Sequence, residues 1–130
     1  MLRQWCPSDI AIDVASPDDG PPVVESQVDA ALVFPALRAA AGRWTEDGYD
    51  AVIIGCFSDP GIDAFREVTG CPVIGPGEAA MLAALQFGDR FSVLSSDPTP
   101  AGLRRRIRAM GIAERFASER LAGASVTDLR

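Results

Sequence analysis

The sequence predicts an α/β fold, a three-layer αβα sandwich of the flavodoxin-like kind with a mostly parallel sheet of about four strands. Short apolar runs alternate with stretches of helical periodicity along most of the chain, which is typical of strands joined by crossover helices. Glycine and proline stand between most of these segments and mark turns. The length of 130 residues fits one domain with a substantial core.

The amino-terminal third predicts one strand and one long helix. Residues 10–15 alternate in the manner of a strand, and the breaker-rich stretch 16–22 follows as a loop. Residues 24–44 carry apolar side chains at helical spacing. Within them, Pro35 is expected to kink the helix or restart it.

The central strand is expected at residues 51–55, where four consecutive apolar residues stand before a glycine. Such a short, continuous apolar run indicates a strand that is buried on both faces. Cys56 stands at its carboxyl end, and residues 61–68 resume as a helix. In open α/β sheets ligands bind outside the carboxyl ends of the strands, where the amino end of the next helix offers partial positive charge. A reactive thiol would be placed there.

The second half continues the alternation of strands and helices. The helix at 79–87 is apolar nearly all round, so we expect it to be buried on more than one side. The expected elements are a strand at 71–75, a helix that begins at 76–78 and runs over 79–87, a strand at 90–94, a helix from Thr99 and Pro100 to Met110, and a short helix within 112–120.

Composition and charge exclude several classes of protein. Hydrophobic residues make up 48% and charged residues 23%, which is a globular composition. A net charge of −6 disfavours nucleic acid and anionic membranes as partners, and the basic cluster at 104–108 is expected to be a solvated helix face. No apolar run is long enough to span a membrane, and residues 1–7 have no signal-peptide core. We therefore expect a cytoplasmic protein.

Three residue types are absent from the sequence, and their absence excludes several kinds of catalytic and metal-binding site. The chain has no His, Lys or Asn, and all 12 basic residues are Arg. This excludes Ser-His-Asp and Cys-His pairs, imidazole metal ligands, a pyridoxal Schiff base and a P-loop lysine. The three cysteines, 50 and 15 residues apart, form no CxxC pair. We expect free thiols and no metal site.

The candidate site gathers around Cys56 at the carboxyl ends of the strands. Cys71 and Cys6 precede strands, so we expect them at the opposite edge, in structural roles. Asp59 could orient the loop behind Cys56 or be an ordinary turn residue, and Glu78 could cap its own helix or face the pocket. The candidate substrate-binding residues are Phe57, Ser58, Asp59, Glu78, Ser95 and Ser96.

Three segments carry a resemblance to a known family. They are Gly-Cys-Phe-Ser-Asp-Pro-Gly at 55–61, Pro-Val-Ile-Gly-Pro-Gly-Glu-Ala-Ala-Met at 72–81, and Arg-Phe-Ser-Val-Leu at 90–94. Together they resemble the hydantoin and allantoin racemases of the aspartate/glutamate racemase superfamily, over residues 17–121. The resemblance implies a cofactor-independent racemase in which two cysteines on opposite faces of a small substrate, a hydantoin or amino-acid derivative, exchange a proton beside a carbonyl. Cys56 would be one of the two.

The chain also departs from that family. The resemblance implies an Asn-Pro-Asn-Thr-like substrate loop, but this sequence has no Asn. It also implies a second, pseudo-symmetric half with another cysteine in a Leu-Gly-Cys-like strand end, which is not found here. We therefore expect residues 1–130 to be a single α/β domain that resembles the amino-terminal half of a two-lobed racemase. Such a chain would be a gene fragment, a remnant or one part of an oligomer, and weak or inactive alone.

Two other functions stay open. One is a non-catalytic, flavodoxin-like binding or remnant domain, since a fold alone implies no function. The acidic stretch at 16–19 would repel the phosphate that flavodoxins bind, and the lack of Lys disfavours a response regulator. The other is a single-thiol isomerase or decarboxylase of the same superfamily. Exchange of a substrate proton with solvent would separate the enzymes from a binding module.

Overall fold

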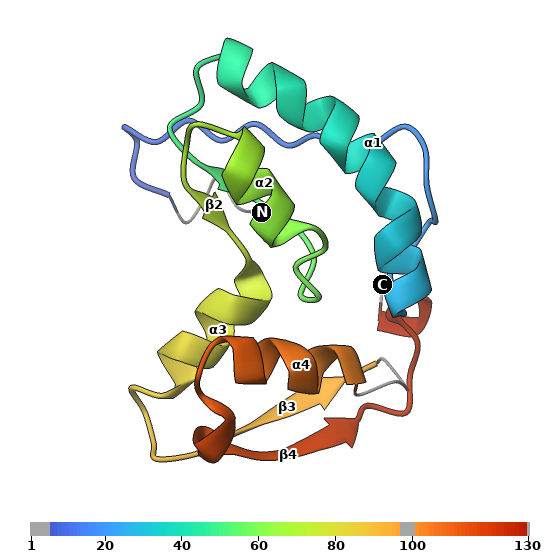
Figure 1. Cartoon of the computed structure of the whole chain (residues 1–130), viewed down its shortest axis with the longest axis vertical. Coiled ribbons are helices and arrows are strands. Elements are labelled where there is room, and N and C mark those ends of the chain that lie inside the picture. Colours follow the sequence, from blue (N-terminus) through green and yellow to red (C-terminus); the bar gives the residue numbers. More distant parts are fainter. Residues whose placement is uncertain (1–5, 97–100, 130) are drawn as a thin grey trace.

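The structure is a computed structural model that describes residues 6–96 and 101–129. Figure 1 shows two groups of elements that the chain joins through α3, and on the opposite side the start of α1 lies beside the C-terminal segment of the second group. The first group contains α1 (Gln27–Glu46), β1 (Val52–Ile53), α2 (Ile62–Val68) and β2 (Val73–Ile74). The second contains α3 (Pro76–Ala84), β3 (Phe91–Ser95), α4 (Ala101–Ala109), β4 (Phe116–Leu121) and the 3₁₀ helices η2 (Ala113–Arg115) and η3 (Val126–Leu129).

The expected α/β class with parallel strands is confirmed, but the described strands do not form one sheet of four. β1 pairs only with β2, and β3 pairs only with β4, both in parallel. The first pair places Val52 beside Val73 and Ile53 beside Ile74. Since α3 follows β2 directly and leads the chain into the second group, β3 finds its partner in β4 instead.

Local sequence signals explain the long helix α1. The Ser26 hydroxyl accepts the backbone N–H of Asp29 at 3.1 Å, while the Asp29 carboxylate accepts the Glu25 N–H, also at 3.1 Å. The Ser26 hydroxyl thus caps an N–H group that a helix start leaves without a partner, and the Asp29 carboxylate fixes the residue before the cap, in a variant of the capping box. Pro35 lies inside the continuous helix, so of the two alternatives expected there, a kink or a restart, the restart does not occur.

Each group has its own apolar core. Phe65 of α2 is fully buried, and its ring centroid lies 5.4 Å from that of Phe34 and 5.6 Å from that of Trp44, both on α1. In the second group the rings of Phe91 and Phe116 lie 5.8 Å apart. The buried residues are Ala41, Ile54, Ile62, Phe65 and Val73 in the first core and Met81, Phe91, Val93 and Ile107 in the second.

The predicted strand at 10–15 is wrong. Residues 10–15 belong to none of the strands in the described part of the chain, and Ile10 and Val14 are exposed. The Tyr49 hydroxyl donates a hydrogen bond to an Asp13 carboxylate oxygen of this stretch at 3.1 Å. Alternating residues form a strand only where a neighbouring strand offers backbone partners, and the described strands pair elsewhere.

The expectation that the central strand is buried on both faces is also wrong. Ile54 is 4% exposed, but its neighbour Ile53 is 67% exposed, and the paired Ile74 is exposed as well. The helix α3 likewise buries Met81 and Gly77 but exposes Leu82, so it is not buried on several sides. An apolar element is buried on both faces only where other elements pack against both. Here other elements pack against one face of the β1–β2 pair and one face of α3.

The predicted helix within 112–120 is largely a strand. Ala113–Arg115 forms one 3₁₀ turn, after which β4 runs parallel to β3. The pairing and the contact between Phe116 and Phe91 are long-range interactions that override the local pattern. The expected helix start at Thr99 and Pro100 lies outside the described residues, and the rest of that helix matches α4. In the described ranges, no helix has the length and apolar character needed to cross a bilayer.

Candidate active-site cleft

The loop between β1 and α2, residues 55–61, is called the cysteine loop below. It turns sharply because Asp59 and Gly61 adopt left-handed backbone conformations, with φ of 50° and 72°. The Asp59 N–H donates to the carbonyl oxygen of Cys56 at 2.9 Å and closes the turn. A Cβ atom at Gly61 would collide with the ring of Phe34, so the loop packs closely against α1.

The buried carboxylate of Asp59 ties this loop to two helices. Its Oδ1 accepts the N–H of Gly77 at 2.9 Å, and its Oδ2 accepts the N–H of Glu78 at 2.8 Å. The guanidinium of Arg106 on α4 donates to the same Oδ2 at 3.1 Å. Burial raises the pKa of Asp59, although these N–H donors and the Arg106 charge act in the opposite direction. Of the two interpretations of Asp59, the structure therefore supports the orientation of the loop.

Asp59→Asn is expected to change how the free energy of unfolding depends on pH. Because the folded state raises the pKa of Asp59 above 3.8, it binds this proton more tightly than the unfolded state does. Linkage then makes the contribution of Asp59 to stability decrease as pH rises from 3.8 through the raised value. Urea unfolding of wild type and Asp59→Asn over a pH series should show that the free energy of unfolding of wild type, relative to that of the variant, falls as pH rises. A difference that grows with pH would contradict this.

Gly77 allows α3 to approach the cysteine loop. A Cβ atom there would collide with the carbonyl oxygen of Phe57 and lie 2.7 Å from Asp59 Oδ2. We expect Gly77→Ala to lower the free energy of unfolding by about 1–3 kcal/mol, as overpacking does. Gly55→Ala is the control, since a Cβ atom there meets nothing within 4 Å. Equal urea midpoints for the two variants would show that the loop and α3 are not in close contact.

The Cys56 thiol faces a cleft of about 1780 Å³ between the two groups of elements. Its Sγ lies 3.2 Å from the Ser58 hydroxyl oxygen, and the side chain is partly exposed. Neither Cys71 nor Cys6 is among the residues that line the cleft. Cys71 precedes β2 whereas Cys56 follows the parallel β1, so the two lie at opposite ends of this strand pair.

The predicted site residues all line this one large cleft. Ser95 and Ser96 lie at the end of β3, although β3 and β1 belong to different sheets. The Glu78 carboxylate accepts a hydrogen bond from Arg66 at 2.7 Å, so it forms an ion pair at the edge of the cleft. The residues predicted from the sequence that line the cleft are Cys56, Phe57, Ser58, Asp59, Glu78, Ser95 and Ser96.

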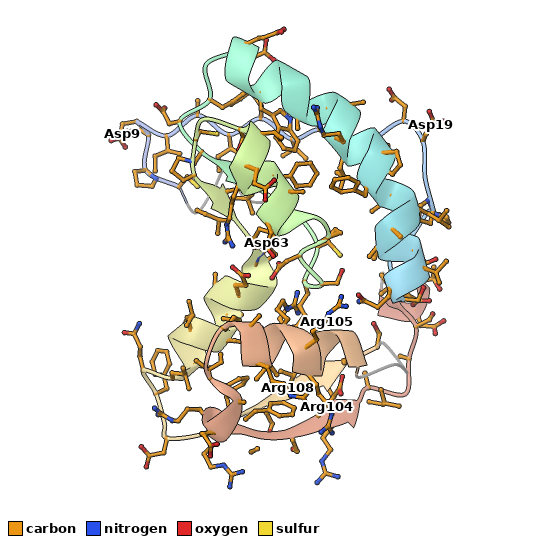
Figure 2. All side chains as sticks on the ribbon, viewed as in Figure 1. Asp9, Asp19, Asp63, Arg104, Arg105 and Arg108 are labelled. Carbon is orange, nitrogen blue, oxygen red and sulfur yellow. The ribbon has the colours of Figure 1, made fainter. Side chains whose placement is uncertain are left out.

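Arginines of the cleft were missed from the sequence. The cluster at 104–108 is not simply a solvated face, because the Arg106 side chain is only 15% exposed. Figure 2 shows Arg105 on the side of α4 that faces the cleft, with Arg104 and Arg108 nearer β3 and β4. A signal for Arg106 was present, since it falls within the helical spacing of the apolar residues Leu103, Ile107 and Met110.

Within the described ranges, no group of three or more Cys, Asp or Glu side chains is arranged to hold a metal ion. The chemistry that the cleft offers is therefore that of a thiol, hydroxyls, carboxylates and guanidinium groups. Of these, a thiol and an ionised carboxylate are suited to moving a proton. Asp59 and Glu78 are each paired with an arginine, and other carboxylates, Asp18 and Asp63 among them, line the cleft together with the Cys56 thiol.

Comparison with known proteins identifies the family. A family model described as Asp/Glu/Hydantoin racemase matches residues 1–130. The chain belongs to this family. It is 40% identical over 91 residues to a hydantoin racemase of Pseudomonas sp. (strain NS671), covering 70% of this chain and 36% of that protein. It is 35% identical over 117 residues to a hydantoin racemase of Paenarthrobacter aurescens, covering 88% of this chain and 50% of that protein.

Solved structures give the same result for this racemase-family chain. The allantoin racemase from Klebsiella pneumoniae superimposes with a TM-score of 0.84 at 30% identity, over 90% of this chain and 48% of that one. The allantoin racemase from Pseudomonas fluorescens gives a TM-score of 0.88 at 26% identity, over 98% of this chain and 54% of that one. The chain thus spans about a third to a half of the relatives that it matches.

Proposed function

We propose that this chain contributes to racemisation of a small hydantoin-like or amino-acid-derived substrate, with the Cys56 thiol transferring a proton at the carbon next to a carbonyl. One observation carries the proposal. Cys56 follows β1, faces the cleft and lies 3.2 Å from the Ser58 hydroxyl, in a chain whose relatives are called hydantoin and allantoin racemases.

The proposed chemistry needs no cofactor. The thiolate takes the proton from the substrate carbon, so that a C–H bond breaks and an S–H bond forms. The electron pair left on carbon moves onto the carbonyl oxygen and gives an enolate, and the reverse step returns a proton. The Ser58 hydroxyl can donate a hydrogen bond to the thiolate from its position beside Sγ. General acid–base transfer by a positioned side chain typically contributes a factor of about 10²–10⁴.

The other cleft residues receive binding roles in this proposal. Phe57 offers a partly exposed ring as an apolar contact for the substrate, and Ser95 and Ser96 offer hydroxyls from the end of β3. Glu78 would contact substrate only from within its ion pair with Arg66. Both oxygens of Asp59 accept hydrogen bonds from the protein, so we assign it to holding the loop rather than to binding substrate.

Inversion at carbon needs a second acid–base group on the opposite face of the substrate, because the proton leaves one face and arrives on the other. Cys6 and Cys71 are absent from the cleft lining. The second group in this proposal is another thiol, so we infer that it comes from a part of the enzyme outside residues 1–130 or from a partner chain, such as a second copy. The 130-residue polypeptide would then be weak or inactive as a racemase.

Solvent exchange tests the role of Cys56. One enantiomer of a 5-substituted hydantoin is incubated in deuterated water with the 130-residue polypeptide, and loss of the proton signal at carbon 5 is followed by NMR. We expect exchange above a protein-free reference. Cys56→Ser should return the rate to that reference, and Cys71→Ser should leave it unchanged. Protein-dependent exchange that survives in Cys56→Ser would show that another group moves the proton, and no exchange at all would support a non-catalytic binding domain.

A further inference from the structure

We propose that Arg106 is a positioning residue for Cys56: from α4 it holds the cysteine loop in place through Asp59 and Phe57. This inference rests on the proposed role of Cys56 and adds a residue to it. Arg106 lies 50 positions further along the sequence than Cys56. It belongs to the second group of elements, while the loop belongs to the first.

The ion pair between Arg106 and Asp59 differs from an ordinary surface salt bridge. The Asp59 side chain is fully buried, and Arg106 Nη1 lies 3.1 Å from its Oδ2. Exposed ion pairs contribute little because water and salt screen them, but removing one partner of a buried pair leaves an uncompensated charge. Without Arg106, the Asp59 carboxylate would keep the two N–H donors of α3 but lose its counter-charge. The loop would then be free to carry this carboxylate toward water.

The same guanidinium also contacts the residue next to Cys56. The Arg106 Cζ atom lies 5.6 Å from the ring centroid of Phe57, within the range of a cation–π contact. Arg106 therefore contacts both Phe57 and Asp59, the residues directly before and after Ser58 in the sequence. Because the Ser58 hydroxyl lies 3.2 Å from Cys56 Sγ, a shift of these three residues would move the polar neighbour of the thiol.

The position of Arg106 in α4 argues against a purely space-filling role. Its Nε–H is buried and has no hydrogen-bond partner in the part of the chain that the structure describes, which carries a desolvation cost. The helix neighbours Leu103, Ile107 and Met110 pack in the second core. An apolar residue at 106 would avoid that cost and extend the apolar face. The guanidinium is instead placed where it bridges the second group to the cysteine loop.

Alkylation of the individual cysteines tests this inference without requiring catalysis. Wild type, Arg106→Leu and Arg106→Lys are treated with iodoacetamide, and the rates at Cys56 and Cys71 are measured by peptide mass spectrometry. Arg106→Leu should speed modification of Cys56 about tenfold, because the loop opens more often. This factor corresponds to a loss of about 1.4 kcal/mol from the free energy that keeps the loop closed. The rate at Cys71, in the same molecule, should not change. Arg108→Leu, at an exposed position of the same helix, should behave as wild type.

Arg106→Lys separates the effect of the guanidinium from that of side-chain size. It also keeps the inference testable if Arg106→Leu does not fold. A lysine keeps the charge opposite Asp59 but lacks the planar guanidinium that lies over Phe57, so its Cys56 rate should fall between those of wild type and Arg106→Leu. In the exchange assay, Arg106→Leu should lower the saturated rate more than it changes KM. Unchanged Cys56 alkylation, or equal acceleration at Cys71, would overturn the inference. Absence of exchange in wild type would overturn the proposed function but leave the alkylation result to decide this one.

Discussion

Phe65→Ala is expected to lower the free energy of unfolding by about 3–5 kcal/mol, the usual cost of removing a buried phenylalanine ring. Phe65 is fully buried, and its ring contacts Phe34 and Trp44 of α1. The residue also lies near Gly61 at the end of the cysteine loop, where Phe34 packs as well. Natural domains are stable by only about 5–15 kcal/mol, so this single change should remove a large part of the stability.

Val68→Ala is the matched control for this prediction. Val68 lies one turn along the same helix, but its side chain is exposed, so its truncation should change stability by about 0.5 kcal/mol or less. Urea unfolding followed by tryptophan fluorescence would measure both variants, since Trp44 packs against Phe65. Similar midpoints for the two variants would show that α1 and α2 do not form a common core.

Local patterns in the sequence predicted the elements whose stability is local. The helix α1 has its capping box and apolar spacing, and α2 follows a Pro-Gly turn, so both could be located from neighbouring residues alone. Residues 10–15 and 116–121 could not be assigned in this way. A strand depends on a partner that is distant in sequence, and the chain supplies such a partner for β4 but not, among the described residues, for 10–15.

The candidate site was predictable to the extent that it follows from strand ends. Cys56, Ser95 and Ser96 each stand at or after the end of a strand, and all three line the cleft. The expected reason, a common sheet, was wrong, because the strands belong to two separate pairs that face the same cleft. Arg106 was missed because its contact with Asp59 joins residues 47 apart in sequence. Charge runs alone favour a solvated face.

The 130-residue polypeptide is expected to exchange the substrate proton without inverting the carbon. In the proposed mechanism Cys56 takes a proton from one face and returns a deuteron to that face, which incorporates deuterium but preserves configuration. A second thiol is not within reach, because Cys71 lies at the opposite end of the β1–β2 pair and neither it nor Cys6 lines the cleft. The carboxylates of Asp59 and Glu78 are engaged by Arg106 and Arg66. Other carboxylates, such as Asp18 and Asp63, also line the cleft, but they have no part in the two-thiol mechanism proposed here.

Polarimetry and NMR on one sample would measure this outcome. A single enantiomer of a 5-substituted hydantoin in deuterated water should lose its proton signal faster than it loses optical rotation, after the protein-free rates of both processes have been subtracted. Cys56→Ser should suppress the protein-dependent exchange. If rotation instead decays as fast as the proton signal and both depend on Cys56, a second acid–base group acts on the opposite face. A decay rate that rises more steeply than in proportion to protein concentration would then place the second group on another copy of the chain. A rate proportional to protein concentration that is lost in Glu78→Gln would place it in this cleft.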